Sequence, residues 1–134
     1  MADEASFGVI LWTTDISGLA YFLRAVAGAE VEEQHPGFAT LRVGGSRIEL
    51  HADETYRGHP WYNALAREGV ARGVGAELRF RVHDVQDAYA RALRSGAHAV
   101  TPPYADGRLM ECQVLAPDGF MVCLWGAAPI GWGE

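Results

Sequence analysis

Residues 77–96, ELRFRVHDVQDAYARALRSG, contain one complete strand–helix unit. Polar and apolar residues alternate from Glu77 to Val82, which is the pattern of a strand with one buried face. Asp84 follows and can accept a hydrogen bond from the first turn of a helix. The apolar stripe of that helix consists of Val85, Ala88, Tyr89, Ala92 and Leu93. Gly96 can adopt the left-handed conformation that ends a helix.

Residues 7–28, FGVILWTTDISGLAYFLRAVAG, repeat this order. The stretch from Phe7 to Thr14 is mostly apolar or β-branched, which favours a strand. Asp15 is a candidate N-cap, and Gly28 is a candidate residue for the helix end. Between them, apolar residues stand at helical spacing, namely Ile16, Leu19, Leu23 and Val26.

Three strand-like runs follow each predicted helix, divided by the turn sequences HPG, GG and PDG. After the first helix these runs are AEVEEQ (29–34), GFATLRV (37–43) and SRIELHA (46–52). After the second they are HAVTPP (98–103), RLMECQVL (108–115) and FMVCLW (120–125). Each half of the chain therefore reads as strand, helix and three strands.

This repetition predicts an α+β fold made of two βαβββ modules, at 7–53 and 75–126, within a single domain of 134 residues. The connector, 54–74, contains HPWYNALAREG, which favours a short helix with Pro60 in its first turn. We predict the two main helices at 15–27 and 84–95.

Composition restricts the possible partners. Hydrophobic residues make up 49% of the chain, enough for a core without disulfides. Seventeen acidic and eleven basic residues give a formal charge of −6, and no basic cluster is present. We therefore expect no nucleic-acid partner.

We expect a soluble, cytoplasmic protein with no membrane partner. The first residues have no positive region followed by a long apolar run, and no stretch approaches the roughly 18 apolar residues of a membrane span. The two cysteines, Cys112 and Cys123, are expected to be free thiols in a reducing compartment.

Three stretches resemble the vicinal oxygen chelate superfamily, which includes glyoxalase I, bleomycin resistance proteins and extradiol dioxygenases. They are TTDISGLAYFLRAVAGAEV, RVHDVQDAYARALRSGA and APDGFMVCL. The resemblance extends from Phe7 to Trp125. It implies that the two modules form a curled mixed sheet around a cup-shaped cavity, which a homodimer often completes.

The resemblance also implies four positions for metal ligands, and here they fall on Gly8, Glu49, Glu77 and Cys123. Glycine has no side chain to coordinate with. Two carboxylates and a thiolate, without histidine, are a poor ligand set for Zn²⁺, Ni²⁺ or Fe²⁺. We therefore expect no metal cofactor, and the alternative is a divalent metal held by Glu49, Glu77 and a displaced ligand such as His51.

Strand alternation assigns side chains to the two faces of each sheet. We expect Ile48, Leu50, Leu78, Phe80 and Val82 to pack under the helices. The opposite face should carry Gly8, Ile10, Trp12, Arg47, Glu49, His51, Glu77, Arg79, Arg81, Met121, Cys123 and Trp125.

Seven residues of this second face are predicted to bind a ligand, namely Ile10, Trp12, Arg79, Arg81, Met121, Cys123 and Trp125. The two tryptophans offer flat surfaces for an aromatic group, and the arginines can pair with the glutamates or with an anionic group. For Cys123 the interpretations are a small cavity-lining residue, which we favour, a metal ligand or a nucleophile.

Three functions are consistent with this sequence. The first is metal-free binding of a hydrophobic aromatic small molecule, as in sequestration by an antibiotic resistance protein. The second is a lyase, isomerase or dioxygenase that uses Glu49 and Glu77 as metal ligands or as a catalytic acid–base pair. The third is a homodimeric scaffold without a ligand. Substrate identity lies beyond the sequence, because one fold hosts many chemistries.

Overall fold

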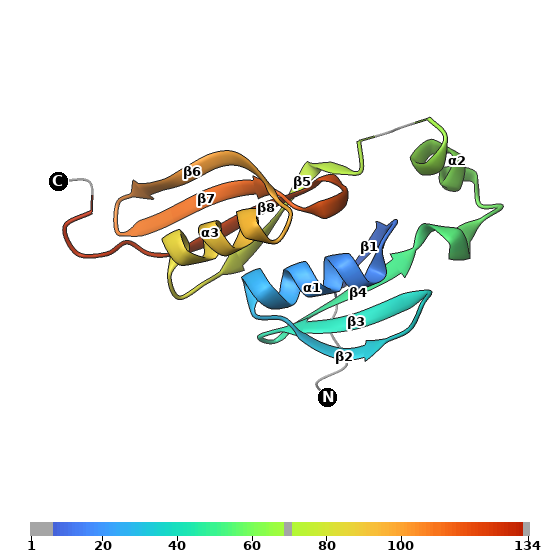
Figure 1. Cartoon of the computed structure of the whole chain (residues 1–134), viewed down its shortest axis with the longest axis horizontal. Helices are drawn as coiled ribbons and strands as arrows, with labels where there is room; N and C mark the ends of the chain where they lie inside the picture. Colours follow the sequence, from blue (N-terminus) through green and yellow to red (C-terminus); the bar gives the residue numbers. More distant parts are fainter. Residues whose placement is uncertain (1–6, 69–70, 133–134) are drawn as a thin grey trace.

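The two predicted βαβββ modules are present in the computed structural model, which describes residues 7–68 and 71–132 (Figure 1). The first module consists of β1 (Val9–Thr13), α1 (Ile16–Ala27), β2 (Glu30–Gln34), β3 (Phe38–Val43) and β4 (Ser46–Ala52). The second consists of β5 (Gly73–Arg81), α3 (Val85–Arg94), β6 (His98–Asp106), β7 (Leu109–Leu115) and β8 (Phe120–Ala127).

Three short helices complete the fold of the described residues. The connector contains the 3₁₀ helix η1 (Asp53–Tyr56) and the helix α2 (Pro60–Ala66), with Pro60 in its first turn as predicted. The PDG turn forms a second 3₁₀ helix, η2 (Pro117–Gly119), directly before β8. Among the described helices, none combines the length and apolarity that a bilayer span requires.

The predicted caps position both main helices. The Asp15 carboxylate accepts a hydrogen bond from the Gly18 amide at 2.9 Å, and the Asp84 carboxylate accepts one from the Asp87 amide at 3.0 Å. Gly28 ends α1 in the left-handed region, at φ 71°. These contacts satisfy backbone groups that a helix terminus leaves unpaired.

Each module has its own four-stranded mixed sheet, with strand orders β1-β4-β3-β2 and β5-β8-β7-β6. In both sheets the first and last strands of the module pair in parallel and the other neighbours are antiparallel. The register sets Leu11 beside Leu50 and Phe80 beside Leu124, so apolar side chains of neighbouring strands share one face.

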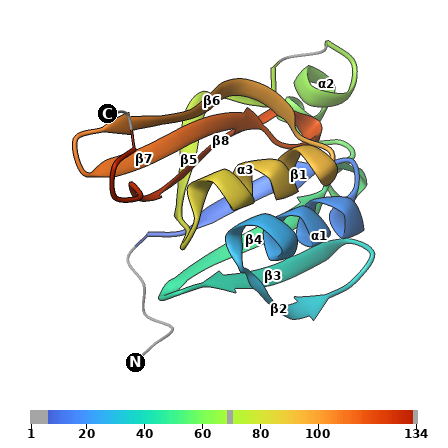
Figure 2. The ribbon, with the colours of Figure 1, turned by 60° about the vertical axis from the view of Figure 1, so that its left-hand side comes forward.

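The core lies between the sheets and the two main helices. Ile48, Leu50 and Phe80 are buried, and Leu78 packs against them, which confirms the predicted packing face. The helices α1 and α3 lie side by side, each against its own sheet (Figures 1 and 2). The Arg91 guanidinium donates a hydrogen bond to the Ala25 carbonyl at 2.9 Å across this helix pair. The opposite faces of both sheets remain free of α1 and α3.

Further polar contacts hold the modules and the connector together. Asp118, in η2, accepts hydrogen bonds from the Thr13 hydroxyl at 2.6 Å and from the Thr14 amide at 2.7 Å. Arg72 donates to both carboxylate oxygens of Asp53, at 2.8 and 2.9 Å, and to the Trp12 carbonyl at 2.9 Å. Both contacts fix the end of β1, where the predicted site residue Trp12 lies.

Candidate functional site

The helix-free face of the first sheet carries a carboxylate–imidazole pair. Glu49 and His51 stand two residues apart on β4, so both side chains leave the same face, and His51 Nε2 lies 3.1 Å from Glu49 Oε1. Ile10 and Trp12 come from the neighbouring strand β1 and point to this face. Gly8 lies just before that strand. The structure therefore brings Ile10, Trp12, Glu49 and His51 together.

An aromatic cluster of Trp12, His51, Tyr56, His59 and Trp61 forms beside this pair. The Trp12 ring lies 4.5 Å from that of Trp61 and 5.6 Å from that of Tyr56. Tyr56 and Trp61 are 4.8 Å apart, because η1 and α2 fold back over the end of β1. The Trp12 Nε1 atom is buried here without a hydrogen-bond partner in the part of the chain that the structure describes.

A hollow of about 440 Å³ opens next to the aromatic cluster. It is lined by Gly37, Phe38, Glu49, His51, Thr55 and Tyr56. Glu49 and His51 were identified from strand alternation. Phe38 and Tyr56 were not. Tyr56 follows His51 closely in sequence, which is a signal that could have found it, whereas Phe38 becomes a neighbour of His51 through the pairing of β3 with β4.

The corresponding face of the second sheet holds a network of charged and polar groups. Arg79 donates to Glu77 at 2.8 Å and to Glu111 at 3.3 Å. The hydroxyl of Tyr104 donates to Glu111 at 2.7 Å. This bond, together with that from Arg79, holds the pKa of Glu111 below its usual range. Glu77 is thus the partner of an arginine in its own module.

Cys123 is fully buried in β8, beneath this network. The Gln113 amide lies 3.7 Å from its sulfur. Burial raises the pKa of the Cys123 thiol, although the positive charge of Arg79 opposes the shift. A thiol that stays protonated near neutral pH is a weak nucleophile and a weak metal ligand, so the geometry favours the role of a small filling residue.

Trp125 is covered on one side by a guanidinium group. The Arg81 side chain lies 5.5 Å from the Trp125 ring centroid, which is the geometry of a cation–π contact. Met121 is half-buried on the same strand. The predicted ligand-binding residues Arg79, Arg81, Met121, Cys123 and Trp125 therefore lie together on the second sheet, whereas Ile10 and Trp12 lie on the first.

The four positions that correspond to metal ligands do not fit a metal. Gly8 offers no side-chain donor atom, burial raises the pKa of the Cys123 thiol, and the carboxylates of Glu49 and Glu77 are engaged by His51 and Arg79. Within residues 7–68 and 71–132, no group of three or more histidine, cysteine, aspartate or glutamate side chains is placed to hold a metal ion. We therefore derive no metal chemistry from these positions.

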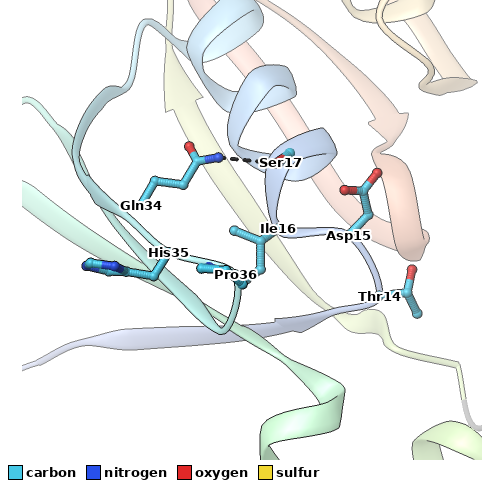
Figure 3. Close-up of a pocket in the computed structure, with 7 residues that line it drawn as sticks. All are labelled: Thr14, Asp15, Ile16, Ser17, Gln34, His35 and Pro36. Carbon is cyan, nitrogen blue, oxygen red and sulfur yellow. Dashed lines mark hydrogen bonds between the residues drawn. The ribbon is translucent and has the colours of Figure 1, made fainter.

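A second hollow, of about 530 Å³, lies at the beginning of α1. It is lined by Thr14, Asp15, Ile16, Ser17, Gln34, His35 and Pro36 (Figure 3). The Gln34 amide bridges it by donating to the Ser17 hydroxyl at 3.2 Å. None of the predicted site residues lines this hollow.

Comparisons with known proteins identify the fold. No protein-family model matches the chain, and no curated protein matches it. Solved structures do match. A glyoxalase/bleomycin resistance protein/dioxygenase family enzyme from Burkholderia phytofirmans PsJN has 24% identity and a TM-score of 0.74, over 92% of this chain and 100% of that one.

Two further solved structures match over most of their length. A glyoxalase-related enzyme from Fulvimarina pelagi has 17% identity and a TM-score of 0.71, over 95% of this chain and 93% of that one. A glyoxalase/bleomycin resistance protein from Albidiferax ferrireducens T118 has 18% identity and a TM-score of 0.67, over 92% and 100%. The chain therefore has the fold of the glyoxalase/bleomycin resistance/dioxygenase proteins.

Proposed function

We propose that this protein binds a planar, hydrophobic small molecule without a metal. The observation that carries the proposal is the hollow of about 440 Å³ between Phe38 and Tyr56, next to the aromatic cluster. Its volume falls within the range of about 300–1,000 Å³ that is typical of small-molecule sites. Aromatic walls favour a flat, apolar ligand.

Two further observations support binding over metal-dependent catalysis. The positions that correspond to metal ligands hold a glycine, a buried thiol and two carboxylates engaged by other side chains. In addition, the similar solved structure from Albidiferax ferrireducens T118 is described as a glyoxalase/bleomycin resistance protein, so the fold is associated with resistance as well as with glyoxalases. Sequestration of a toxic aromatic compound is the function that these features support best.

We expect 7-methoxycoumarin, a planar probe, to quench tryptophan fluorescence and to raise the melting temperature, because Trp12 and Trp61 lie beside the hollow. Titration of the purified protein measures both effects. Replacing Trp12 with phenylalanine should remove the part of the quenching that Trp12 contributes and leave that of Trp61. A lack of quenching and of thermal shift with planar aromatic probes, or stoichiometric metal by elemental analysis, would contradict the proposal.

The Glu77→Gln variant is a matched control for this titration. Glu77 is paired with Arg79 on the second sheet, so the variant should bind the probe within about tenfold of the original affinity, a change of at most ~1.4 kcal/mol. If Glu77 were instead a general base in a reaction, the same variant would keep its affinity and lose roughly 10²–10⁴ in rate.

We also propose that the protein is a homodimer. Ile130 and Trp132, near the end of the chain, are exposed, as is Phe7 before β1. Contact with a second copy of the chain would bury these large apolar side chains, which favours association.

Light scattering at micromolar concentration should give about twice the monomer mass of 14.5 kDa. Replacing Ile130 and Trp132 with serine should shift the mass toward that of a monomer, and a monomeric mass for the original protein would refute the proposal.

A further inference from the structure

Tyr56, His51 and Glu49 form a continuous hydrogen-bonded chain along the wall of the hollow. The Tyr56 hydroxyl lies 2.8 Å from His51 Nδ1, and His51 Nε2 lies 3.1 Å from Glu49 Oε1. All three side chains line the hollow. The His51 side chain is 18% exposed, so its two ring nitrogens have these two partners and little contact with solvent.

For a neutral His51 imidazole, the chemistry of its two partners assigns the direction of both hydrogen bonds. The oxygens of a carboxylate can only accept hydrogen bonds. His51 Nε2 must therefore donate to Glu49, which leaves Nδ1 of the neutral imidazole as an acceptor. The Tyr56 hydroxyl then donates its single proton to Nδ1. As a result, the Tyr56 oxygen has only lone pairs left to offer to a ligand.

Packing holds this oxygen in place. The Tyr56 ring lies 4.8 Å from the Trp61 ring, 5.1 Å from the His59 ring and 5.6 Å from the Trp12 ring. An acceptor whose position is fixed before the ligand arrives costs little further ordering on binding. Hydrogen bonds in a chain also polarise one another, which strengthens the outer acceptor.

We propose that Tyr56 determines specificity and selects a planar aromatic ligand that carries an O–H or N–H donor, such as a phenol or a heterocyclic N–H. The inference rests on the proposed function and names the class of its ligand. The donor of the ligand bonds to the Tyr56 oxygen, and Glu49 acts through His51 as a positioning residue. A matched ligand without the donor should bind about tenfold more weakly, as expected for the loss of one hydrogen bond.

The test compares 7-hydroxycoumarin with 7-methoxycoumarin, which have the same ring system and differ in the hydrogen-bond donor. Isothermal titration should show about a tenfold preference for the hydroxyl compound. In Tyr56→Phe the preference should vanish, because the affinity for 7-hydroxycoumarin falls while that for 7-methoxycoumarin is retained. A purely structural role for Tyr56 would weaken both probes equally, which would overturn the inference.

Glu49→Gln provides an independent readout, since it leaves Tyr56 in place. A glutamine side chain has both an acceptor oxygen and a donor NH₂, so it no longer holds His51 in a single tautomer. Where the amide donates to Nε2, Nδ1 carries the proton and bonds to the Tyr56 oxygen, and the tyrosine hydroxyl is free to donate. The preference for the hydroxyl compound should then shrink. Two results would each overturn this inference and leave the proposed function standing. One is a tenfold preference for 7-hydroxycoumarin that survives in both variants. The other is an equal affinity of the original protein for both probes. Binding of neither probe would overturn both.

Discussion

Replacing Arg72 with alanine is expected to lower the free energy of unfolding by about 3–5 kcal/mol, because it leaves a buried carboxylate without its partner. The side chains of Arg72 and Asp53 are 12% and 9% exposed, and two hydrogen bonds join them. The Trp12 carbonyl would lose its bond from Arg72 as well. Chemical denaturation monitored by circular dichroism measures the change.

Three variants test the cause of this effect. Arg72→Lys keeps the charge but not the bidentate geometry, so its free energy of unfolding should lie between those of the original protein and Arg72→Ala. Arg108→Ala removes an exposed arginine and should change the stability by less than about 0.5 kcal/mol. The double variant Asp53→Ala, Arg72→Ala should be more stable than Arg72→Ala alone, since no unpaired charge remains. A loss below about 1 kcal/mol in Arg72→Ala would contradict the assigned role.

Replacing Asp118 with alanine is expected to lower the free energy of unfolding by about 2–3 kcal/mol, the second large effect. The Asp118 carboxylate accepts from the Thr13 hydroxyl, the Thr14 amide and the Thr14 hydroxyl, at 2.6, 2.7 and 2.9 Å. These bonds join the end of β1 to the turn before β8. Denaturation of the variant measures the loss, and Asp118→Asn is the matched control, because it preserves the shape and tolerates the φ of 70°.

The Asp118 contact also predicts a dependence of stability on pH. Burial alone would raise the pKa of Asp118, but the hydrogen bonds from Thr13 and Thr14, with the charge of Arg72, hold it below its usual value. A lowered pKa in the folded state contributes stability above the unfolded-state pKa. That contribution is lost as the pH falls through the folded-state pKa. The stability difference between the original protein and Asp118→Ala should therefore shrink in acid, and a difference independent of pH would contradict the argument.

The repeated strand–helix pattern was sufficient to predict both modules. Asp15 and Asp84 precede apolar residues at helical spacing, and both cap their helices through contacts three residues away. Strand alternation correctly placed Leu50 and Phe80 in the core. These features depend on local hydrogen bonds and on side-chain periods of 3.6 and 2, which can be read from neighbouring residues.

Part of the candidate site follows from the same local rules. Glu49 and His51 were expected on one face of a strand, and their contact at 3.1 Å is a consequence of the two-residue period. Glu77 and Arg79 pair for the same reason. The chemistry of Cys123 was left open, because it depends on burial and on the approach of Arg79 and Gln113 from other strands.

Tertiary structure alone assigns the roles of Arg72, Asp118 and Tyr56. Arg72 reaches the Trp12 carbonyl, 60 residues earlier, and Asp118 reaches Thr14, 104 residues earlier. Tyr56 is close to His51 in sequence, yet its place in the aromatic cluster depends on η1 and α2 folding over β1. The apolar residues of the connector show no regular spacing from which its course over β1 could be predicted. Its course is decided by contacts with residues far away in the sequence, such as that of Trp61 with Trp12, which local patterns do not reveal.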